Sequence, residues 1–202
     1  MAYATVAELA EYLGLSDNLS AGVLASTEKT TRLSLALDAA TSHIDNDTGR
    51  TFSSTTATKC LTPDGSYELQ VPDLVSVTTL KIDTDANASW ETTLSATNYE
   101  LNKYHENIAA WPYEFIVRLD DVWPVPYANG RRKLVEIVGV WGWAATPEPI
   151  KQACLLLAGR LFQRANAVMG VQGFSDFGAF SVRNNDPDYR ALIDTYKKPG
   201  IA

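Results

Sequence analysis

The chain has 202 residues, of which 46% are hydrophobic and 20% are charged, so it is long enough to bury a sizeable core and has the composition of a folded globular protein. Its formal net charge of −7 argues against wrapping DNA with a broad basic face, because such binding depends on Lys and Arg side chains that neutralise phosphates. The first residues lack a basic region followed by an apolar run, and no stretch approaches a membrane span, so we expect neither a signal peptide nor a membrane helix.

Two helices are expected within the first 50 residues. Thr5 and Glu8 form a capping-box pattern, in which each side chain satisfies a free backbone amide at a helix start, and Gly14 is the expected end. From about Ser26 a longer helix is predicted, because apolar residues recur with spacings of three and four and so share one face, and Gly49 should end it. These apolar residues are Leu33, Leu37, Ala40 and Ile44.

After Phe52 the pattern changes to the alternation that is typical of strands. The Ser/Thr-rich residues 53–56 are expected to be a link into this region. Six short strands separated by turn residues predict a small antiparallel barrel or sandwich. The predicted strands are Tyr67 to Val71, Val75 to Val77, Leu80 to Asp83, Tyr99 to Leu101, Phe115 to Leu119 and Leu134 to Val140.

Helical periodicity returns at residues 146–148, where Thr, Pro and Glu fit the N-cap and first turn of a helix. Apolar residues from Ile150 to Ala165 then step by three and one, which is the clearest helical signal in the chain, and Gly170 is the expected end. A segment rich in Gly and Phe follows. Residues 186–188 are predicted to open a last short helix that extends to Tyr196.

We therefore expect an α+β fold: a small helical bundle formed by both chain ends, with an inserted antiparallel β barrel or sandwich-like module and an extended C-terminal segment. The helical core would be discontinuous, built from residues 1–56 and 147–170, and residues 57–146 would form the β-rich module. Residues 171–202 would form a C-terminal arm with a short helix. The last 56 residues hold seven basic and five acidic side chains, so this part is suited to an acidic partner.

Side chains that catalyse reactions or bind metals are sparse. The two histidines, His43 and His105, do not form a nucleophile–base pattern with a Ser, Cys or Thr and are interpreted as structural or solvated residues. Cys60 and Cys154 lie too far apart to indicate a disulfide framework, and no CxxC or HxxxH spacing marks a zinc site. We therefore predict a protein that is not an enzyme, with no catalytic residues, no cofactor and no metal site.

Residues 83–87, with the sequence Asp-Thr-Asp-Ala-Asn, begin like a calcium-binding loop. The sixth position is Ala88 where the motif has Gly, and the twelfth is Leu94 where the motif has a bidentate Glu. An acidic turn is the favoured interpretation, and cation binding by this loop is left open.

All five tryptophans lie between Trp90 and Trp143, which fits either a sugar-stacking surface or, as we favour, rings that pack in a small β core or an interface. A basic hairpin tip is predicted next to the turn residues Asn129 and Gly130. This tip is interpreted either as a solvated turn or as a contact with nucleic acid or an acidic partner. It consists of Arg131, Arg132 and Lys133.

Several motifs occur in a familiar order: a helix that ends near residues 44–52, strands at residues 69–77, 99–101 and 138–143, and an Ala-rich helix over residues 147–164. In this order they resemble the head-tail connector (adaptor) proteins of long-tailed bacteriophages. The resemblance extends to about residue 170 and rests on structural rather than catalytic motifs.

The resemblance implies a structural ring, a dodecamer, that docks under the portal protein and carries the stopper and tail-completion proteins. Such a protein is assembled in the host cytoplasm and is located in the neck of the virion. DNA would pass through the lumen without specific binding, and an acidic lumen would lower its attraction to phosphate.

In that family the C-terminal segment commonly reaches along the portal, so the resemblance implies partner contacts there. We predict portal or partner contacts at Phe174, Phe177, Phe180, Arg183, Arg190 and Tyr196, and a second contact at the β tip, Arg131, Arg132 and Lys133. The alternative from another class is a carbohydrate-binding or virion-surface decoration module that uses the Trp-rich β insert.

Overall fold

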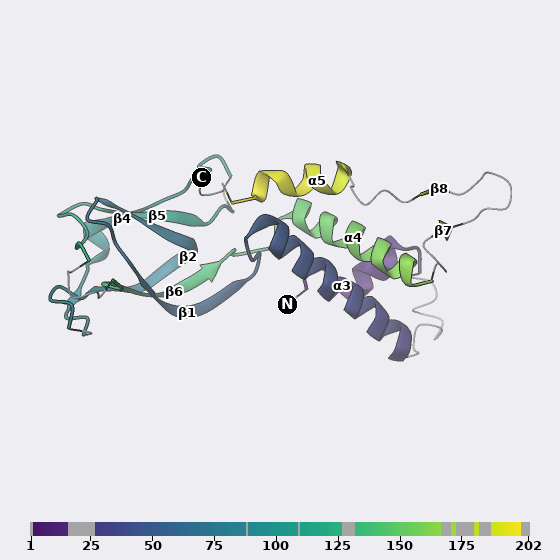
Figure 1. The fold of residues 1–202 in the computed structure, drawn as a ribbon, viewed down its shortest axis with the longest axis horizontal. Helices are drawn as coiled ribbons and strands as arrows, with labels where there is room; N and C mark the ends of the chain where they lie inside the picture. The colour runs from purple at the N-terminus through teal and green to yellow at the C-terminus, as the bar shows by residue number, and fades with distance from the viewer. Residues whose placement is uncertain are drawn as a thin grey trace. The chain divides into compact units, whose positions relative to one another are not determined.

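A computed structural model of the chain describes residues 2–15, 27–87, 89–108, 110–126, 132–166, 171–172, 180–181 and 187–198 (Figure 1). The chain divides into two compact units: a helical unit, Met1–Arg50 with Thr146–Ala202, and a β unit, Thr51–Ala145. Helices lie in the first unit and a six-stranded antiparallel sheet in the second, so the predicted α+β class is confirmed. Among the described residues, no helix is both long enough and apolar enough to cross a membrane.

The first helix, α1 (Val6–Tyr12), begins at the predicted capping box. The Thr5 hydroxyl accepts a hydrogen bond from the Glu8 amide at 3.2 Å, and the Thr5 amide donates to the Glu8 carboxylate at 2.8 Å. The same carboxylate pairs with Lys151 of α4 (Glu148–Asn166) at 2.6 Å. Just past the helix Gly14 has φ +68°, a left-handed conformation that favours glycine.

Helix α3 (Thr27–Thr48) packs against α4 with the apolar face that its spacing predicts. Leu33, Leu37, Ala40 and Ile44 are each at most 1% exposed. They belong to the same core as the buried residues of α4, which include Ile150, Ala153, Cys154 and Ala158. Gly49, with φ +65°, ends α3 as expected, whereas Gly170, the expected end of α4, lies outside the described residues.

The predicted last short helix is present as α5 (Pro187–Ile193), which continues as the 3-10 turn η3 (Asp194–Tyr196). It packs on α4 and buries Tyr189, Ile193 and Tyr196. The Lys198 amide also donates to the carbonyl of Thr48 at 3.0 Å. Residues 187–198 are therefore part of the packed helical unit, and β7 (Val171–Gln172) and β8 (Phe180–Ser181) pair antiparallel before them.

The β unit is one antiparallel sheet in the order β1-β6-β2-β5-β4, with β3 paired to the end of β2. Its strands are β1 (Ser54–Leu61), β2 (Glu68–Ile82), β3 (Thr92–Thr93), β4 (Tyr99–Asn102), β5 (Tyr113–Arg118) and β6 (Val135–Gly142). A short 3-10 turn, η1 (Ala96–Asn98), precedes β4. In the part of the chain that the structure describes, β1 and β4 are the two edges and do not pair, so the sheet is not the closed barrel that the sequence analysis had as one of its options.

The long strand β2 pairs with both β5 and β6. Its first half, up to Leu74, pairs with β5, and its second half, from Leu74 to Ile82, pairs with β6. The register shifts between Gln70 and Leu74, where Pro72 has no amide to donate to the ladder. The three strands predicted between residues 67 and 83 are thus one strand with irregular register. It pairs with different strands along its two halves, and residues from both halves belong to one core.

Strand β1 is not among the strands that the sequence predicts, because the Ser/Thr-rich residues 53–56 have the composition of a link. Ser54 and the residues after it instead pair along all of β6, from Ser54↔Gly142 to Leu61↔Val135. The first three residues of β1 are exposed, so the segment has no apolar alternation from which a strand could be recognised. It is an edge strand, and its backbone hydrogen bonds to β6 define it, because its first residues have no buried apolar face of their own.

Tryptophans fill the core of the β unit, as the packing interpretation predicted. Trp111, Trp123, Trp141 and Trp143 are each at most 2% exposed. The Trp141 indole donates to the carbonyl of Ala57 at 2.8 Å, and the Trp143 indole donates to the buried Asp73 carboxylate at 3.3 Å. Their polar edges are therefore satisfied inside the core.

We expect Gly142→Ala to destabilise the β unit by more than about 2 kcal/mol, because Gly142 has φ +96° and a Cβ there would overlap the carbonyl oxygen of Ser53. Gly14→Ala should cost only about 1 kcal/mol, since a Cβ there meets nothing within 4 Å. Urea unfolding followed by tryptophan fluorescence reads the β unit, which holds all five tryptophans, and far-UV circular dichroism reads the helices. Equal losses for the two variants would contradict this account.

The stability of the helical unit should depend on pH through Glu8. Hydrogen bonds from Lys151 first, and then from Thr5, lower the pKa of Glu8 from 4.5 to about 2. Since the folded state favours the charged carboxylate, the stabilisation is complete above about pH 5 and is lost as the pH falls toward 2.

Glu8→Gln should therefore cost up to about 1 kcal/mol at pH 7 and almost nothing near pH 2; solvent around this partly exposed carboxylate keeps the effect small. Thermal unfolding followed at 222 nm across this pH range measures the effect. Glu11→Gln, at an exposed position on the same helix, is the control. A loss for Glu8→Gln that does not change with pH would refute the assignment.

Candidate functional site

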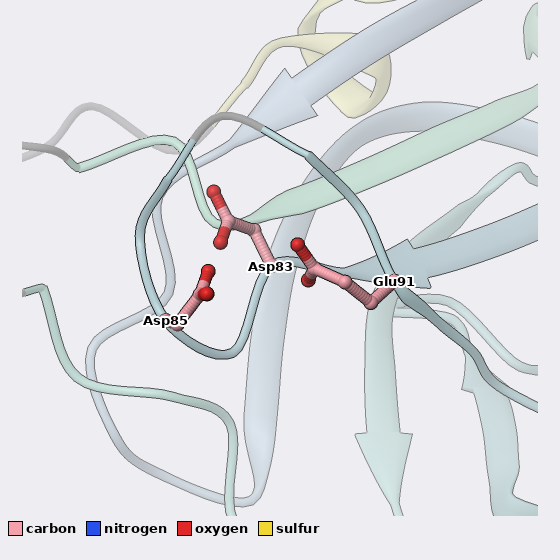
Figure 2. A group of neighbouring side chains, drawn as sticks. All are labelled: Asp83, Asp85 and Glu91. Carbon is pink, nitrogen blue, oxygen red and sulfur yellow. The ribbon is translucent and has the colours of Figure 1, made fainter.

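Three carboxylates gather at the turn that follows β2. Asp83, Asp85 and Glu91 point toward one another, and each offers one oxygen within 4.8 Å of the others (Figure 2). Asp83 is fully buried, and its amide donates to the carbonyl of Leu134 at 2.9 Å, which fixes the start of the turn against the strand next to it. These oxygens are of the type that hard cations bind.

Hydrogen bonds within the turn account for its shape. The Asn87 amide donates to both Asp83 and Asp85, each at 3.2 Å, and the Ser89 hydroxyl donates to Glu91. The bond from Ser89 is the main cause of the lowered pKa of Glu91. Leu94, at the twelfth motif position, is 7% exposed and lies in the β core, so that position packs instead of supplying a ligand, while Ala88 lies outside the described residues. The acidic-turn interpretation explains the geometry without a cation.

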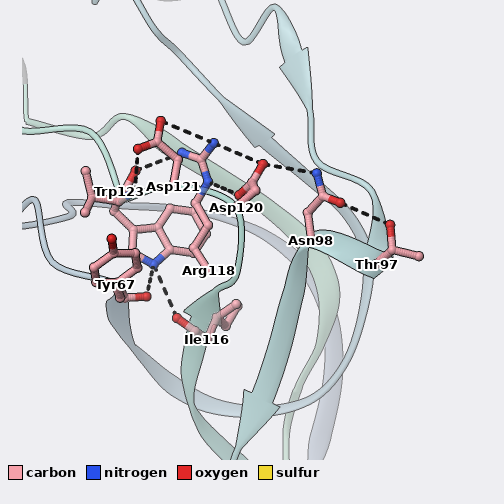
Figure 3. A network of polar contacts seen from close by, with 9 residues as sticks. Tyr67, Thr97, Asn98, Ile116, Arg118, Asp120, Asp121 and Trp123 are labelled. Atoms are coloured by element: carbon pink, nitrogen blue, oxygen red, sulfur yellow. Dashed lines mark hydrogen bonds and ion pairs between the residues drawn. The ribbon is translucent and has the colours of Figure 1, made fainter.

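A second polar network holds the loop that follows β5 (Figure 3). The Arg118 guanidinium, whose side chain is 14% exposed, pairs with Asp120 at 2.7 Å and donates to the carbonyl of Val122 at 2.9 Å. The Asn98 amide also donates to Asp120 at 3.1 Å. Arg118 is the main cause of the lowered pKa of Asp120. The network ties the loop to the end of β5 and to the residue before β4.

Trp123 anchors the other side of this loop. Its side chain is fully buried, and its indole lies 3.0 Å from the carbonyl oxygen of Tyr67 and 3.3 Å from that of Ile116, donating to both. Its backbone amide donates to the carbonyl of Ser66 at 2.8 Å. The segment between Arg118 and Trp123 is thus held at both ends (Figure 3).

In the helical unit, Tyr189 fastens α5 to α3. Its hydroxyl donates to Asp47 at 3.1 Å and lies 3.3 Å from Nδ1 of His43, which itself lies 3.2 Å from the Asp47 carboxylate. Burial, and then the charge of Asp47, raises the pKa of Tyr189. His43 is therefore part of a structural contact between helices.

The other histidine lies in a stack of aromatic rings. His105 contacts Trp111 at 4.3 Å between ring centroids, Trp111 contacts Trp143 at 5.0 Å, and Trp143 contacts Phe52 at 5.1 Å. Next to this stack is a small hollow lined by apolar residues and by Lys103, whose ammonium lies 5.0 Å from the ring of Tyr113. The lining residues include no acid, His, Cys or Ser, and the ammonium of Lys103 lies by the Tyr113 ring, so the hollow holds no nucleophile paired with a base.

The predicted partner-contact residues fall in different places. Phe174, Phe177, Arg183 and Arg131 lie outside the described residues, and the backbone of Phe180 pairs with Gln172 in the β7–β8 hairpin. The described ones also differ. Arg190 is exposed on α5, Tyr196 is buried at 9%, and Arg132 and Lys133 are exposed just before β6.

One surface feature was missed by the sequence analysis. Four large apolar side chains are exposed, and backbone bonds and contacts place their segments at one end of the β unit. They are Tyr67, Leu119, Val122 and Val125. Two signals could have indicated them: Leu119 and Val122 flank the acidic pair 120–121, and Val125 lies between two prolines. Val122 and Val125 fit neither the period of a strand nor that of a helix, whereas Leu119 continues the alternation of the predicted strand Phe115 to Leu119.

No protein-family model and no curated protein matches the chain. Among solved structures, a chain in the neck of an empty gene transfer agent particle, computed with C6 symmetry, aligns with a TM-score of 0.57 and 21% identity, over 99% of this chain and 92% of that one. A chain in the virion of a native gene transfer agent particle aligns with a TM-score of 0.50 and 22% identity, over 86% of this chain and 80% of that one. At these identities the likeness shows a shared fold.

Tyr189→Phe should loosen α5, because the variant loses the hydrogen bond to Asp47 but keeps the buried ring. The loss of about 1 kcal/mol should speed amide hydrogen exchange in residues 190–196 roughly fivefold. Exchange measured by mass spectrometry after pepsin digestion tests this. Arg190→Gln, at an exposed position of the same helix, should leave the exchange unchanged. Wild-type exchange rates in Tyr189→Phe would show that the hydroxyl does not hold the helix.

Proposed function

We propose that this chain is a structural head-tail connector, or adaptor, of a tailed bacteriophage or a related particle. In this role copies of the chain form a ring below the portal that joins the DNA-filled head to the neck and tail. One observation carries the proposal: the fold is shared over 99% of the chain with a protein of a gene transfer agent neck. The order of motifs from the helix end at residues 44–52 to the Ala-rich helix at 147–164 supports it independently.

The environments of the reactive side chains fit a structural role. His43 joins α3 to α5, and His105 packs in the aromatic stack. The Cys154 thiol lies 3.8 Å from the Thr41 hydroxyl, and burial raises its pKa, which disfavours the reactive thiolate. Cys60 is half-buried and also free of a disulfide. These groups support a protein that works through its surfaces rather than by catalysis.

The carbohydrate-binding alternative loses its main support. Stacking on a sugar needs an exposed aromatic face, whereas Trp111, Trp123, Trp141 and Trp143 are each at most 2% exposed. Only Trp90 is half-exposed. A single ring of this kind does not make a sugar-binding surface.

The charge of the chain suits a ring through which DNA passes. Residues 57–146 hold twelve acidic and seven basic side chains, so a lumen lined by this part would repel phosphate rather than retain it. Partner binding would then fall to other surfaces, among them the basic C-terminal part that contains Arg190.

The direct test is to remove the protein from particles. Particles assembled without this chain should contain filled heads and separate tails, because no connector joins them, and electron microscopy with counts of joined particles measures this. Supplying the wild-type chain should restore joining. Normal joined particles in its absence would sink the proposal.

A point variant refines this test better than deletion of residues 171–202, since α5 and η3 together bury three side chains in the helical unit. Arg190→Glu should lower binding to the purified portal of the same particle roughly tenfold, without changing stability, because it reverses an exposed charge at a predicted contact. Lys29→Glu, also exposed on a helix, is the matched control. Equal portal binding by the two variants would remove Arg190 from the contact.

A further inference from the structure

Seven large hydrophobic side chains are exposed in the part of the chain that the structure describes. Four of them come from segments that contact one another at one end of the β unit, through the bonds of Arg118 to Tyr67 and Val122 and the approach of Val125 to Gly65. We name these four the rim patch. Their exposed fractions range from 37% to 62%. Exposed apolar side chains on a protein surface are ordinarily scattered singly, and four close together are unusual. The rim patch consists of Tyr67, Leu119, Val122 and Val125.

The backbone beneath the rim patch is held rigidly. Tyr67 is joined to Arg118 by a backbone hydrogen bond of 2.9 Å, and Val122 is held through its carbonyl by the Arg118 guanidinium at 2.9 Å. Trp123, fully buried, supplies the anchor between Val122 and Val125 (Figure 3). A loop fixed in this way loses little conformational entropy when it binds, which favours a contact surface over a solvent-exposed turn.

Acidic side chains border the rim patch. Glu68 and Glu100 both lie opposite Val117 in the sheet, two residues from Leu119, and both are exposed. Asp120 and Asp121 are exposed within the loop itself. Arg118, next to Leu119, is turned inward to Asp120. The surface therefore has an apolar centre and an acidic border, and its complement is apolar with a basic border.

The same chain carries a basic segment that has no acidic partner among the described residues. Arg132 and Lys133 are exposed before β6 and form no ion pair with any residue that the structure describes. A third base, Arg131, precedes them in the sequence. This segment is the kind of surface that the acidic border of the rim patch would attract.

We infer that the rim patch of one copy contacts the Arg132–Lys133 segment of a second copy of this chain. The inference rests on the ring in the proposed function and assigns one of its contacts. If the rim patch paired with itself, the carboxylates of one copy would face those of the other and repel them. These carboxylates belong to Glu68, Glu100, Asp120 and Asp121. DNA is disfavoured for the same reason, because its phosphates would meet the acidic border.

The contact is head-to-tail where each copy gives its rim patch to one neighbour and its Arg132–Lys133 segment to another. A head-to-tail contact leaves one surface of each kind open at the ends of a chain of copies, and it closes into a ring when the rotation between copies allows. This is the arrangement that the proposed connector needs.

A charge swap between copies tests the contact. Glu68→Lys and Lys133→Glu should each weaken self-association about tenfold at low salt, because each places like charges across the contact. The chain that carries both substitutions should recover to within about threefold of the wild type, since opposite charges face each other again. Glu106→Lys, in the exposed loop between β4 and β5, should have no effect.

The apolar centre is tested separately. Leu119→Ser should weaken self-association about tenfold at both low and high salt, whereas Tyr104→Ser, at a similarly exposed position outside the rim patch, should not. Sedimentation velocity over a concentration series, with and without the purified neck partners, measures all variants. Urea unfolding checks that each variant is folded.

The possible results separate the two ideas. A wild type that stays monomeric both alone and with its neck partners would overturn the proposed ring and this contact together. A wild type that associates while all three single variants associate equally well would overturn the contact alone. Variants that self-associate normally but no longer join the neck partners would assign the rim patch to a different protein and so refute the second copy as its occupant.

Discussion

The pairing of β1 with β6 is the constraint on which the rest of the chain depends. These strands open and close the β unit, and their ladder runs without a register shift from Ser54↔Gly142 to Leu61↔Val135. It places the entry and exit of a segment of about ninety residues side by side, so the chain can leave one helix and return to the next. Gly142 permits this close approach, because only a residue without a Cβ fits beside the carbonyl of Ser53.

The elements that sequence could predict are those whose own residues carry the signal. The faces of α3 and α4 follow from spacings within each helix, and the caps at Thr5, Gly14 and Gly49 follow from local chemistry. The pairing of β1 and the continuity of β2 depend on residues far away in the chain. An edge strand with exposed Ser and Thr looks like a link, and a proline inside a bulge looks like a strand end. Both errors share this cause.

The surface sites were harder to predict for the same reason. The acidic turn was visible as a local pattern, yet the approach of Glu91 and the burial of Leu94 depend on how β2 and β3 pair. The Arg118 network joins residues from the ends of β5 and η1 with the start of β2, which no spacing reveals. Exposed apolar residues such as Val125 give no periodic signal at all. Local sequence did predict the burial of the tryptophans, because large apolar rings clustered in a small β module are most stable in its core.

The acidic border of the rim patch bears on assembly as well as on affinity. A rigid apolar surface risks pairing with itself, and such contacts would compete with the ordered assembly proposed for this chain. Carboxylates around the apolar centre make that pairing repulsive while leaving a basic segment attractive, so one set of charges both rejects the wrong contact and selects the right one. Because Glu68 and Glu100 stand on strands rather than on flexible loops, the repulsion is held at fixed positions. Specificity in this surface thus comes from the sheet that positions the charges as much as from the charges themselves.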